Sequence, residues 1–168
     1  DFVVVSGEVT SKAVFDKKAQ EELVRKTIKE IGYNDKELMF DGDTCKVDLR
    51  LHSQSPDISQ GVTATEEKEQ GAGDQGLMFG YATNETEELM PMPILLAHKL
   101  IQKLSEVRRN KTLAWVRPDG KSQVSVKYED HKPTKIETVV ISTQHAPEIS
   151  QEEISNEIID KVIKPVLG

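Results

Sequence analysis

A run of glycines with one carboxylate among them, Gly71–Gly76, stands in the middle of the chain. The glycine spacing matches the G-x-G-x-x-G pattern of a dinucleotide-binding turn, which follows a buried strand and opens a helix. Here the charged run Glu66–Gln70 comes first and no helical stripe follows, which excludes that site. No Lys-Ser/Thr pair follows the last glycine, which also excludes a P-loop. Two interpretations remain: a turn that lets backbone pack closely, or a site where Asp74 binds a ligand ammonium group or a metal ion.

A second polar segment, Gln54–Gly61, carries hydrogen-bonding side chains at every second or third residue. It lies within Ser53–Gly76, a stretch without apolar periodicity that is rich in turn-forming residues and is expected to be a long loop. Long loops in compact proteins are often lids or linkers. One interpretation is therefore a solvated connection. The other is a lid that orders over a substrate and excludes water.

The stretch Trp115–Gln123 is expected to be a turn that leads into a strand, because Pro-Asp-Gly is common in turns. A lysine directly before a strand, here Lys121, can be held rigidly toward a phosphate group as a point charge with three donors. Glu8 lies near the end of an expected strand, where an exposed carboxylate at the sheet edge is the ordinary interpretation. His98 and His145 have no spaced partner, which favours surface or capping roles.

Composition limits the classes of function. The 168 residues include 22 Lys plus Arg against 29 Asp plus Glu, and the formal charge of -7 argues against nucleic acid bound by charge attraction alone. The single cysteine, Cys45, cannot form an internal disulfide or, with four scattered histidines, complete a zinc site. This cysteine usage predicts a reducing, cytoplasmic compartment. The longest apolar stretch, Met92–Ala97, is far too short to span a membrane.

Hydrophobic periodicity predicts an α+β fold. A β-branched strand over Asp1–Val9, an amphipathic helix over Lys17–Ile31 and an alternating strand over Cys45–His52 predict a β-α-β unit. Asp16 is the expected N-cap of that helix and Gly32 its stop.

The second half is expected to hold a helix, a hairpin and a final helix. These elements are predicted over residues 93–110, 122–128, 135–143 and 150–165. Pro93 suits the first turn of the first helix, and Ser150 with Glu153 makes a capping box for the last, which Pro165 ends. The expected architecture is β-α-β-type sub-domains, with amphipathic helices packed on mixed or antiparallel sheets, joined by a long flexible loop.

Taken together, these segments resemble the S-adenosylmethionine synthetase (methionine adenosyltransferase) family. The most specific segment is Gly71–Ala82, which is similar to the family's glycine-rich signature. Further segments are similar to family segments in the same order: Gly7–Thr10, Gln54–Ile58, Gln60–Val62, Asn84–Thr86, Arg117–Lys121 and Ser142–His145. The resemblance covers essentially the whole chain. It implies that residues 1–56 are the C-terminal part of the N-terminal synthetase domain, 54–70 a flexible active-site loop and linker, and 71–168 the central domain.

The resemblance also implies a reaction, the synthesis of S-adenosylmethionine from ATP and L-methionine with release of phosphate and pyrophosphate. In family members the methionine sulfur attacks the ribose C5′ in line and expels the triphosphate. Because a thioether is an adequate neutral nucleophile, positioning and stabilisation of the leaving group carry the reaction. The alternative is a non-catalytic fragment that binds a nucleotide or methionine, or that serves only dimerisation.

Roles for individual residues follow from the same resemblance. Glu8, Gln54 and Asp74 match the family's methionine-binding residues. Asp119, Gly120 and Lys121 match its ATP-contacting turn, and Lys121 and Asp74 are the expected catalytic residues. The expected flexible loop comprises Gln54, Ser55, Pro56, Asp57, Ile58, Ser59, Gln60, Gly61, Val62, Thr63 and Ala64. No metal ligand is expected within the chain.

Mg²⁺ and K⁺ are implied as cofactors, with ligands mainly from family segments that this sequence lacks. Those segments are an early stretch with His, Pro, Asp and Lys, a potassium-binding glutamate, and the carboxy-terminal third. We therefore expect an internal piece of a longer cytoplasmic enzyme, without turnover by itself, that acts as a homodimer or a dimer of dimers. Its expected partners are ATP and L-methionine as substrates, with no nucleic acid and no membrane.

Overall fold

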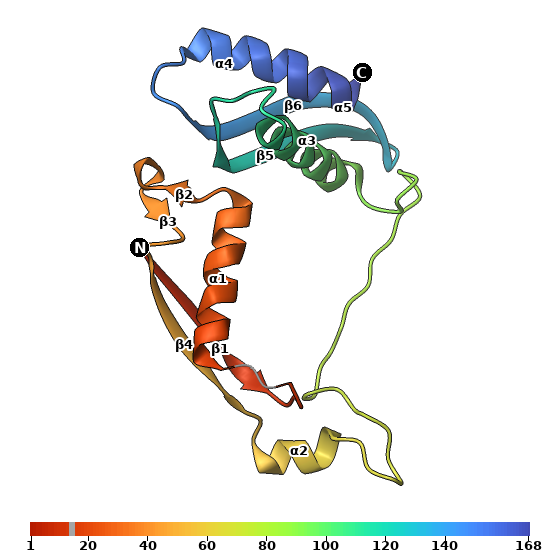
Figure 1. Cartoon of the computed structure of the whole chain (residues 1–168). Coiled ribbons are helices and arrows are strands. Elements are labelled where there is room, and N and C mark those ends of the chain that lie inside the picture. The colour runs from red at the N-terminus through yellow and green to blue at the C-terminus, as the bar shows by residue number, and fades with distance from the viewer. Residues whose placement is uncertain (14–15) are drawn as a thin grey trace. The chain divides into compact units, whose positions relative to one another are not determined.

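The computed structural model describes residues 1–13 and 16–168, which form two units, Asp1–Phe79 and Gly80–Gly168 (Figure 1). Both units combine helices with small sheets, so the predicted α+β class is confirmed. In chain order the elements of the first unit are β1 (Phe2–Val9), α1 (Lys17–Ile31), β2 (Asn34–Asp35), η1 (Lys36–Leu38), β3 (Phe40–Asp41), β4 (Lys46–Ser53) and α2 (Pro56–Val62).

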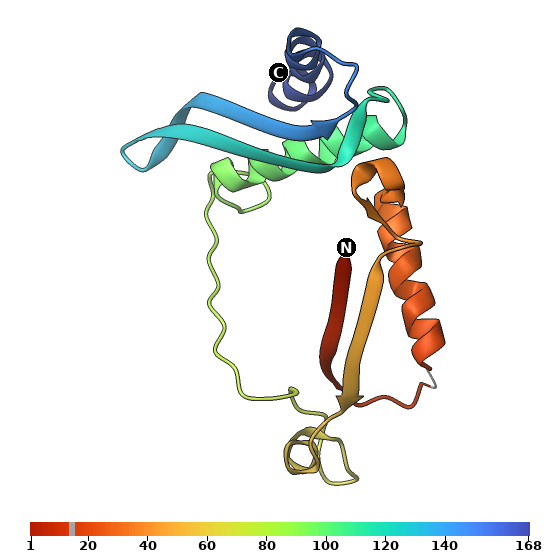
Figure 2. The same cartoon turned by 90° about the vertical axis from the view of Figure 1, so that its left-hand side faces the viewer.

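The first unit is built on a parallel pair of strands. β1 and β4 are in register from Phe2 opposite Lys46 to Val9 opposite Ser53. Parallel strands need a crossover connection, usually a helix, and α1 supplies it, lying alongside both strands in the two views (Figures 1 and 2). The predicted β-α-β unit is confirmed.

Both ends of α1 are set by the residues that the sequence indicated. The Asp16 side chain accepts a hydrogen bond from the Ala19 amide at 2.8 Å, which satisfies one of the free amides of the first turn. Gly32 stops the helix at φ 122°, a left-handed conformation that favours glycine. Arg25 then fixes the helix to the segment before β4, because its Nη1 donates to the Gly42 carbonyl at 2.8 Å.

The prediction of an irregular loop throughout Ser53–Gly76 is wrong over Pro56–Val62, which form the helix α2. Its start depends on Pro56 in the first turn, where the missing N–H costs nothing. The Ser59 and Thr63 hydroxyls lie 2.8 Å apart one turn from each other, which closes the end of the helix. Periodicity could not indicate α2 because no side chain in it is buried.

The second unit contains α3 (Met92–Arg109), β5 (Val116–Glu129), β6 (Lys132–His145), α4 (Gln151–Ile158), the π-helical turn η2 (Ile159–Ile163) and α5 (Lys164–Leu167). β5 and β6 form an antiparallel hairpin with α3 against it (Figure 2). The hairpin is longer than predicted, and its turn is only the pair Asp130 and His131, both at positive φ. This two-residue turn twists the way paired strands twist, so the ladder continues almost to the tip.

The expected turn at Arg117–Lys121 lies inside β5 instead. The strand accommodates Pro118 and Asp119 because the pairing register shifts between Val116 and Gly120, which leaves extra residues outside the ladder.

Apolar residues of α3, the hairpin and the C-terminal helices make one core. Its buried members are Ala97, Leu100, Leu104, Val107, Leu113, Val116, Val124, Ile158 and Val162. Leu100 and Val162 are completely inaccessible to solvent. A Cβ at position 120 would lie 2.9 Å from Leu104 Cδ2, so Gly120 allows α3 to pack closely on β5 at the expected ATP-contacting turn.

The last helical segment begins as predicted and ends differently. Ser150 and Glu153 form the predicted capping box, with each side chain bonded to the other residue's amide. Pro165 does not end the helix, because α5 continues through it to Leu167. The wide turn η2 ends at Ile163, two residues before the proline, and such π-type turns accommodate a residue that lacks a backbone donor.

Truncation of Leu100 tests this core. We expect Leu100→Ala to lower the free energy of unfolding of the second unit by about 2–5 kcal/mol, since it leaves a cavity in a fully buried site. Ile94→Ala on the same helix, where the side chain is 44% exposed, should change it by less than about 1 kcal/mol. Urea titration followed by fluorescence of the single tryptophan, Trp115, measures both. Equal losses of unfolding free energy in the two variants would contradict the assignment of Leu100 to the buried core.

Candidate functional site

In the first unit, two of the expected methionine-binding residues, Glu8 and Gln54, lie where the parallel strands end. Glu8 is opposite His52 in the ladder, and Gln54 directly follows the last paired residue of β4. Because β1 and β4 run in the same direction, their carboxyl ends meet at one edge of the sheet. The Gln54 side chain donates from Nε2 to the Gly73 carbonyl at 3.4 Å, which brings the glycine-rich segment to this edge.

Asp74 therefore follows a residue that is bonded to Gln54. Its Oδ1 accepts a hydrogen bond from the Gln75 amide at 2.7 Å, and its side chain is exposed, as is that of Glu8. Carboxylates and carboxamides are groups that can bind an ammonium ion and give a further polar contact.

The expected flexible loop is tied back onto the glycine-rich segment by Gln70, a residue that the sequence analysis did not identify. Gln70 Nε2 donates to the Val62 carbonyl at 2.8 Å, and its Oε1 accepts from the Ala64 amide at 3.2 Å. The Gly71 amide donates to the same Val62 carbonyl at 2.8 Å. These bonds connect α2 to the segment that carries Asp74, so movement of one changes the other. The only feature of the sequence that could have indicated this role of Gln70 is its position directly before the glycine-rich segment.

In the second unit, two segments far apart in the chain form one small cavity. Asp119, Gly120 and Lys121 on β5 lie beside Ser142, Thr143 and Gln144 on β6, around a cavity of about 230 Å³. Gly120 is opposite Thr143 and Lys121 opposite Ser142 in the ladder. The residues of β5 and β6 that line the cavity thus belong to segments that resemble the family, and the Lys121 side chain contributes a positive charge.

Gln144 in this cavity has an unusual environment. Its Oε1 is buried and, in the described part of the chain, is the one buried side-chain oxygen or nitrogen atom without a hydrogen-bond partner. An unpaired buried carbonyl costs about 1–3 kcal/mol relative to a paired one. From the sequence, Gln144 was only part of a segment that resembles the family, because an unpaired buried atom depends on packing and leaves no mark in the sequence.

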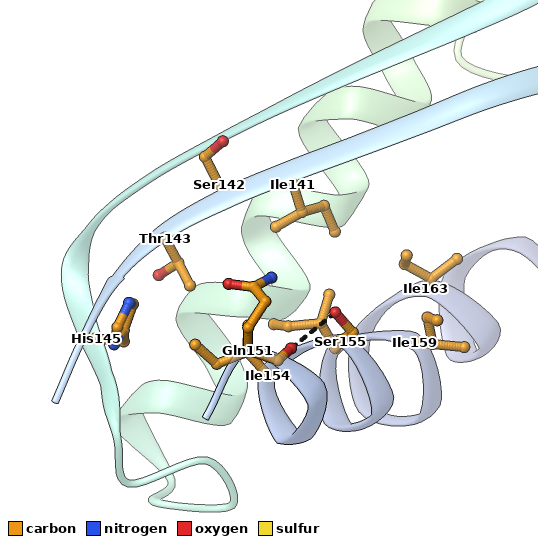
Figure 3. Close-up of a pocket in the computed structure, with 10 residues that line it drawn as sticks. Ile141, Ser142, Thr143, His145, Gln151, Ile154, Ser155, Ile159 and Ile163 are labelled. Atoms are coloured by element: carbon orange, nitrogen blue, oxygen red, sulfur yellow. Dashed lines mark hydrogen bonds between the residues drawn. The ribbon is translucent and has the colours of Figure 1, made fainter. Parts of the chain in front are cut away.

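A larger cavity of about 380 Å³ lies between β6 and α4 (Figure 3). Its floor is made by isoleucines from both elements, among them Ile141 and Ile154, and its rim carries Thr143, Gln151 and His145. His145 is exposed, with Nδ1 2.8 Å from its neighbour's carbonyl oxygen. This cavity shares Ser142 and Thr143 with the smaller one, yet its lining contains no lysine, arginine, aspartate or glutamate.

No metal centre is formed by the residues that the structure describes, since they contain no group of three or more His, Cys, Asp or Glu side chains able to hold an ion. Among the described helices, none has the length and apolar character that crossing a bilayer requires.

Replacement of Gln144 tests whether its oxygen is unpaired. We expect Gln144→Met to leave the free energy of unfolding unchanged or to raise it by about 1 kcal/mol, because it removes an unsatisfied carbonyl at similar volume. Gln123→Met, at an exposed position of β5, is the matched control and should be neutral. Urea titration gives the free energy of unfolding of both variants. A loss of about 2 kcal/mol in Gln144→Met would contradict the claim that the Gln144 oxygen has no hydrogen-bond partner.

Two protein-family models match the chain. One is described as S-adenosylmethionine synthetase, N-terminal domain, and it matches residues 1–56. The other is described as S-adenosylmethionine synthetase, central domain, and it matches residues 69–168, more than half of the chain. The matches contain Glu8 and Gln54 in the first case, and Asp74 and Lys121 in the second. The chain therefore belongs to the S-adenosylmethionine synthetase family.

Proposed function

We propose that this chain takes part in the synthesis of S-adenosylmethionine from ATP and L-methionine, with release of phosphate and pyrophosphate. The observation that carries the proposal is the match to both the N-terminal and the central synthetase domain in the family's order. Further family segments and a second subunit complete the active site, in a cytoplasmic homodimer or dimer of dimers. Residues 1–56, 54–70 and 71–168 are the proposed N-terminal part, loop with linker and central domain.

The methionine end of the site is assigned to the edge of the parallel sheet. Glu8 and Asp74 bind the ammonium group, and Gln54 makes a further hydrogen bond to the amino acid. What supports this assignment is the bond from Gln54 to Gly73, which puts the carboxamide next to the segment of Asp74. Holding the polar end in a fixed place orients the thioether sulfur, and orientation is the main requirement of an in-line attack.

The bond changes balance without a general base. The sulfur lone pair forms the S–C5′ bond while the C5′–O bond to the triphosphate breaks, and the electron pair stays on the leaving oxygen. Sulfur becomes a sulfonium, and no proton moves in this step. Negative charge grows on the leaving triphosphate, so a preorganised cation there lowers the barrier more than it favours substrate binding.

Lys121 is the proposed cation for that role, with Asp119 on the nucleoside side. The pairing of Lys121 with Ser142 and of Gly120 with Thr143 supports a rigid placement of this part of β5. Mg²⁺ and K⁺ are the cofactors that the family resemblance implies, and no step is assigned to them here.

The segment 54–64 is the proposed gate over the methionine end. Gln54 belongs both to this segment and to the binding edge, and Gln70 bonds the far end of the segment to Gly71 and its neighbours. A substrate that orders this segment also fixes the residues beside Asp74, which excludes water from the reacting atoms.

Lys121→Ala in a synthetase that contains this chain is the test. We expect kcat to fall by about 10²–10³, the loss seen when one preorganised donor to a developing oxyanion is removed, with the KM for methionine nearly unchanged. Lys127→Ala, an exposed lysine of the same strand that pairs with Glu129, is the matched control and should retain full turnover. Formation of S-adenosylmethionine from ATP and methionine measures both.

Unchanged turnover in Lys121→Ala would remove this residue from the phosphate role. Absence of S-adenosylmethionine even in the synthetase that contains the unchanged chain would contradict the proposed function as a whole. In that case calorimetry with ATP and with methionine distinguishes a binding module, which retains affinity, from a fragment that serves only association.

A further inference from the structure

One cavity of the second unit contains both an unpaired acceptor and an unpaired cation. The Gln144 side-chain oxygen, Oε1, is buried and accepts no hydrogen bond from the described residues. Lys121 lines the same cavity of about 230 Å³ and takes part in none of the ion pairs formed within the described part of the chain. The cavity therefore offers one positive charge and one hydrogen-bond acceptor that the protein itself does not use.

The strand ladder places these two groups on one face of the hairpin. Lys121 lies opposite Ser142, and Gln144 is two residues farther along β6. Alternate side chains of a strand point to the same face, and residues directly opposite each other share a face. The side chains of Lys121, Ser142 and Gln144 are therefore neighbours, so that one ligand can contact all three.

An irregular stretch of β5 explains why the Gln144 oxygen has no donor. The pairing register shifts between Val116 and Gly120, so Gln144 lies across from residues 117–119. One of these, Pro118, has no amide hydrogen to donate. The hydroxyl of the residue before Gln144 donates to two backbone carbonyls instead, at 3.1 and 3.4 Å. Bulges of this kind are frequent beside active sites, where they change the direction of a side chain.

The unpaired oxygen of Gln144 costs the protein stability. A carbonyl that is buried without a donor loses its hydrogen bonds to water and gains none in return. Such groups are few in native proteins, and a role in a functional site is one recognised reason for them. A donor supplied by a ligand would restore the lost hydrogen bond. The oxygen therefore favours the binding of a molecule that carries such a donor.

The charges in the cavity restrict the kind of donor that pairs with this oxygen. An ammonium group would pair with the Asp119 carboxylate rather than with a neutral carbonyl, and Lys121 repels it. A triphosphate is attracted by Lys121, but it presents acceptor oxygens and does not pair with another acceptor. The donor is therefore a neutral O–H or N–H group, on the same ligand whose phosphate the lysine binds.

The size of the cavity indicates how much of such a ligand enters it. Sites that enclose a whole ligand of drug size have volumes of about 300–1,000 Å³, and this cavity is smaller. It therefore accommodates part of a nucleotide. In ATP the neutral donors are the two ribose hydroxyls and the adenine amino group.

The Gln144 oxygen reaches this cavity through a small movement of its own amide. The residue keeps some exposed surface although the oxygen has almost none. The last torsion of a glutamine side chain has a broad energy profile, so the amide turns at low cost. Pairing with a ligand then accompanies binding, in a space from which water is already excluded.

We propose that Gln144 is a nucleoside-binding residue: its Oε1 accepts a hydrogen bond from a neutral donor of ATP, a ribose hydroxyl or the adenine amino group, while Lys121 binds the phosphate. This role rests on the proposed function, which makes ATP the ligand of the cavity. It makes Gln144 a determinant of nucleotide specificity, because a nucleotide that lacks the donor leaves the oxygen unpaired.

Three ATP analogues, each without one donor, test the pairing in a synthetase that contains this chain. They are 2′-deoxyATP, 3′-deoxyATP and purine riboside triphosphate, which lacks the amino group. With the unchanged enzyme we expect the KM of one analogue to exceed that of ATP about three- to tenfold, because one hydrogen bond is lost. In Gln144→Met the KM for ATP should rise by a similar factor. The ratio of that analogue's KM to the KM for ATP should then fall to about one, since the acceptor is gone.

Two further variants separate this role from a general loss of structure. Gln123→Met, at an exposed position of β5, is the matched control and should leave every KM unchanged. Gln144→Asn keeps the amide but withdraws it by one carbon, so it should lose part of the discrimination between ATP and the analogue. The KM for methionine should stay within about twofold in all variants, which a loss of folded enzyme structure would not allow.

The outcomes distinguish this role from the proposed function. The analogue whose KM ratio to ATP falls to about one in Gln144→Met identifies the donor. If the enzyme makes S-adenosylmethionine but no ratio differs between the unchanged enzyme and Gln144→Met, the nucleoside-binding role is overturned and the proposed function stands.

If the unchanged enzyme makes no S-adenosylmethionine, the proposed function fails. Calorimetry of ATP and the three analogues without methionine then decides the pairing. The same fall in the ratio of dissociation constants in Gln144→Met supports the hydrogen bond to Oε1, and unchanged ratios overturn it.

Discussion

The parallel pairing of β1 with β4 is the constraint on which the proposed methionine-binding site depends. Strands that run in the same direction place their carboxyl ends at one edge, and here that edge holds Glu8 at the end of one strand and Gln54 just after the other. An antiparallel pairing would put the two residues at opposite ends of the sheet.

The second unit uses the opposite strand arrangement for a different purpose. Its antiparallel hairpin brings two distant segments side by side, so that Lys121 and Ser142 become neighbours in the ladder. The register shift before Gly120 sets Asp119 outside the regular pairing, while Gly120 lets α3 approach the strand. Core packing and the geometry of the proposed ATP-contacting turn therefore depend on the same residue.

The sequence was most informative where a single residue type decides local structure. Asp16, Gly32 and the pair Ser150 and Glu153 act within one helical turn, and all are found in the roles predicted for them. The sequence was misleading at two places. Hydrophobic periodicity could not indicate α2, because that helix has no buried side chain, and Pro165 does not stop the last helix, because the wide turn before it accommodates the proline. The candidate site was also only partly predictable. Resemblance indicated the segments, but the orphaned oxygen of Gln144 arises from contacts between distant residues.

The central claim is that Glu8 and Asp74 bind the same amino acid from one edge of the first unit. A double-mutant cycle measures it most directly, with Glu8→Gln, Asp74→Asn and the double variant compared by the KM for methionine in a synthetase that contains this chain. Side chains that share one ammonium group should be coupled, so the double variant should lose clearly less affinity than the sum of the single losses. Strictly additive losses, or a KM that none of the variants changes, would contradict the account.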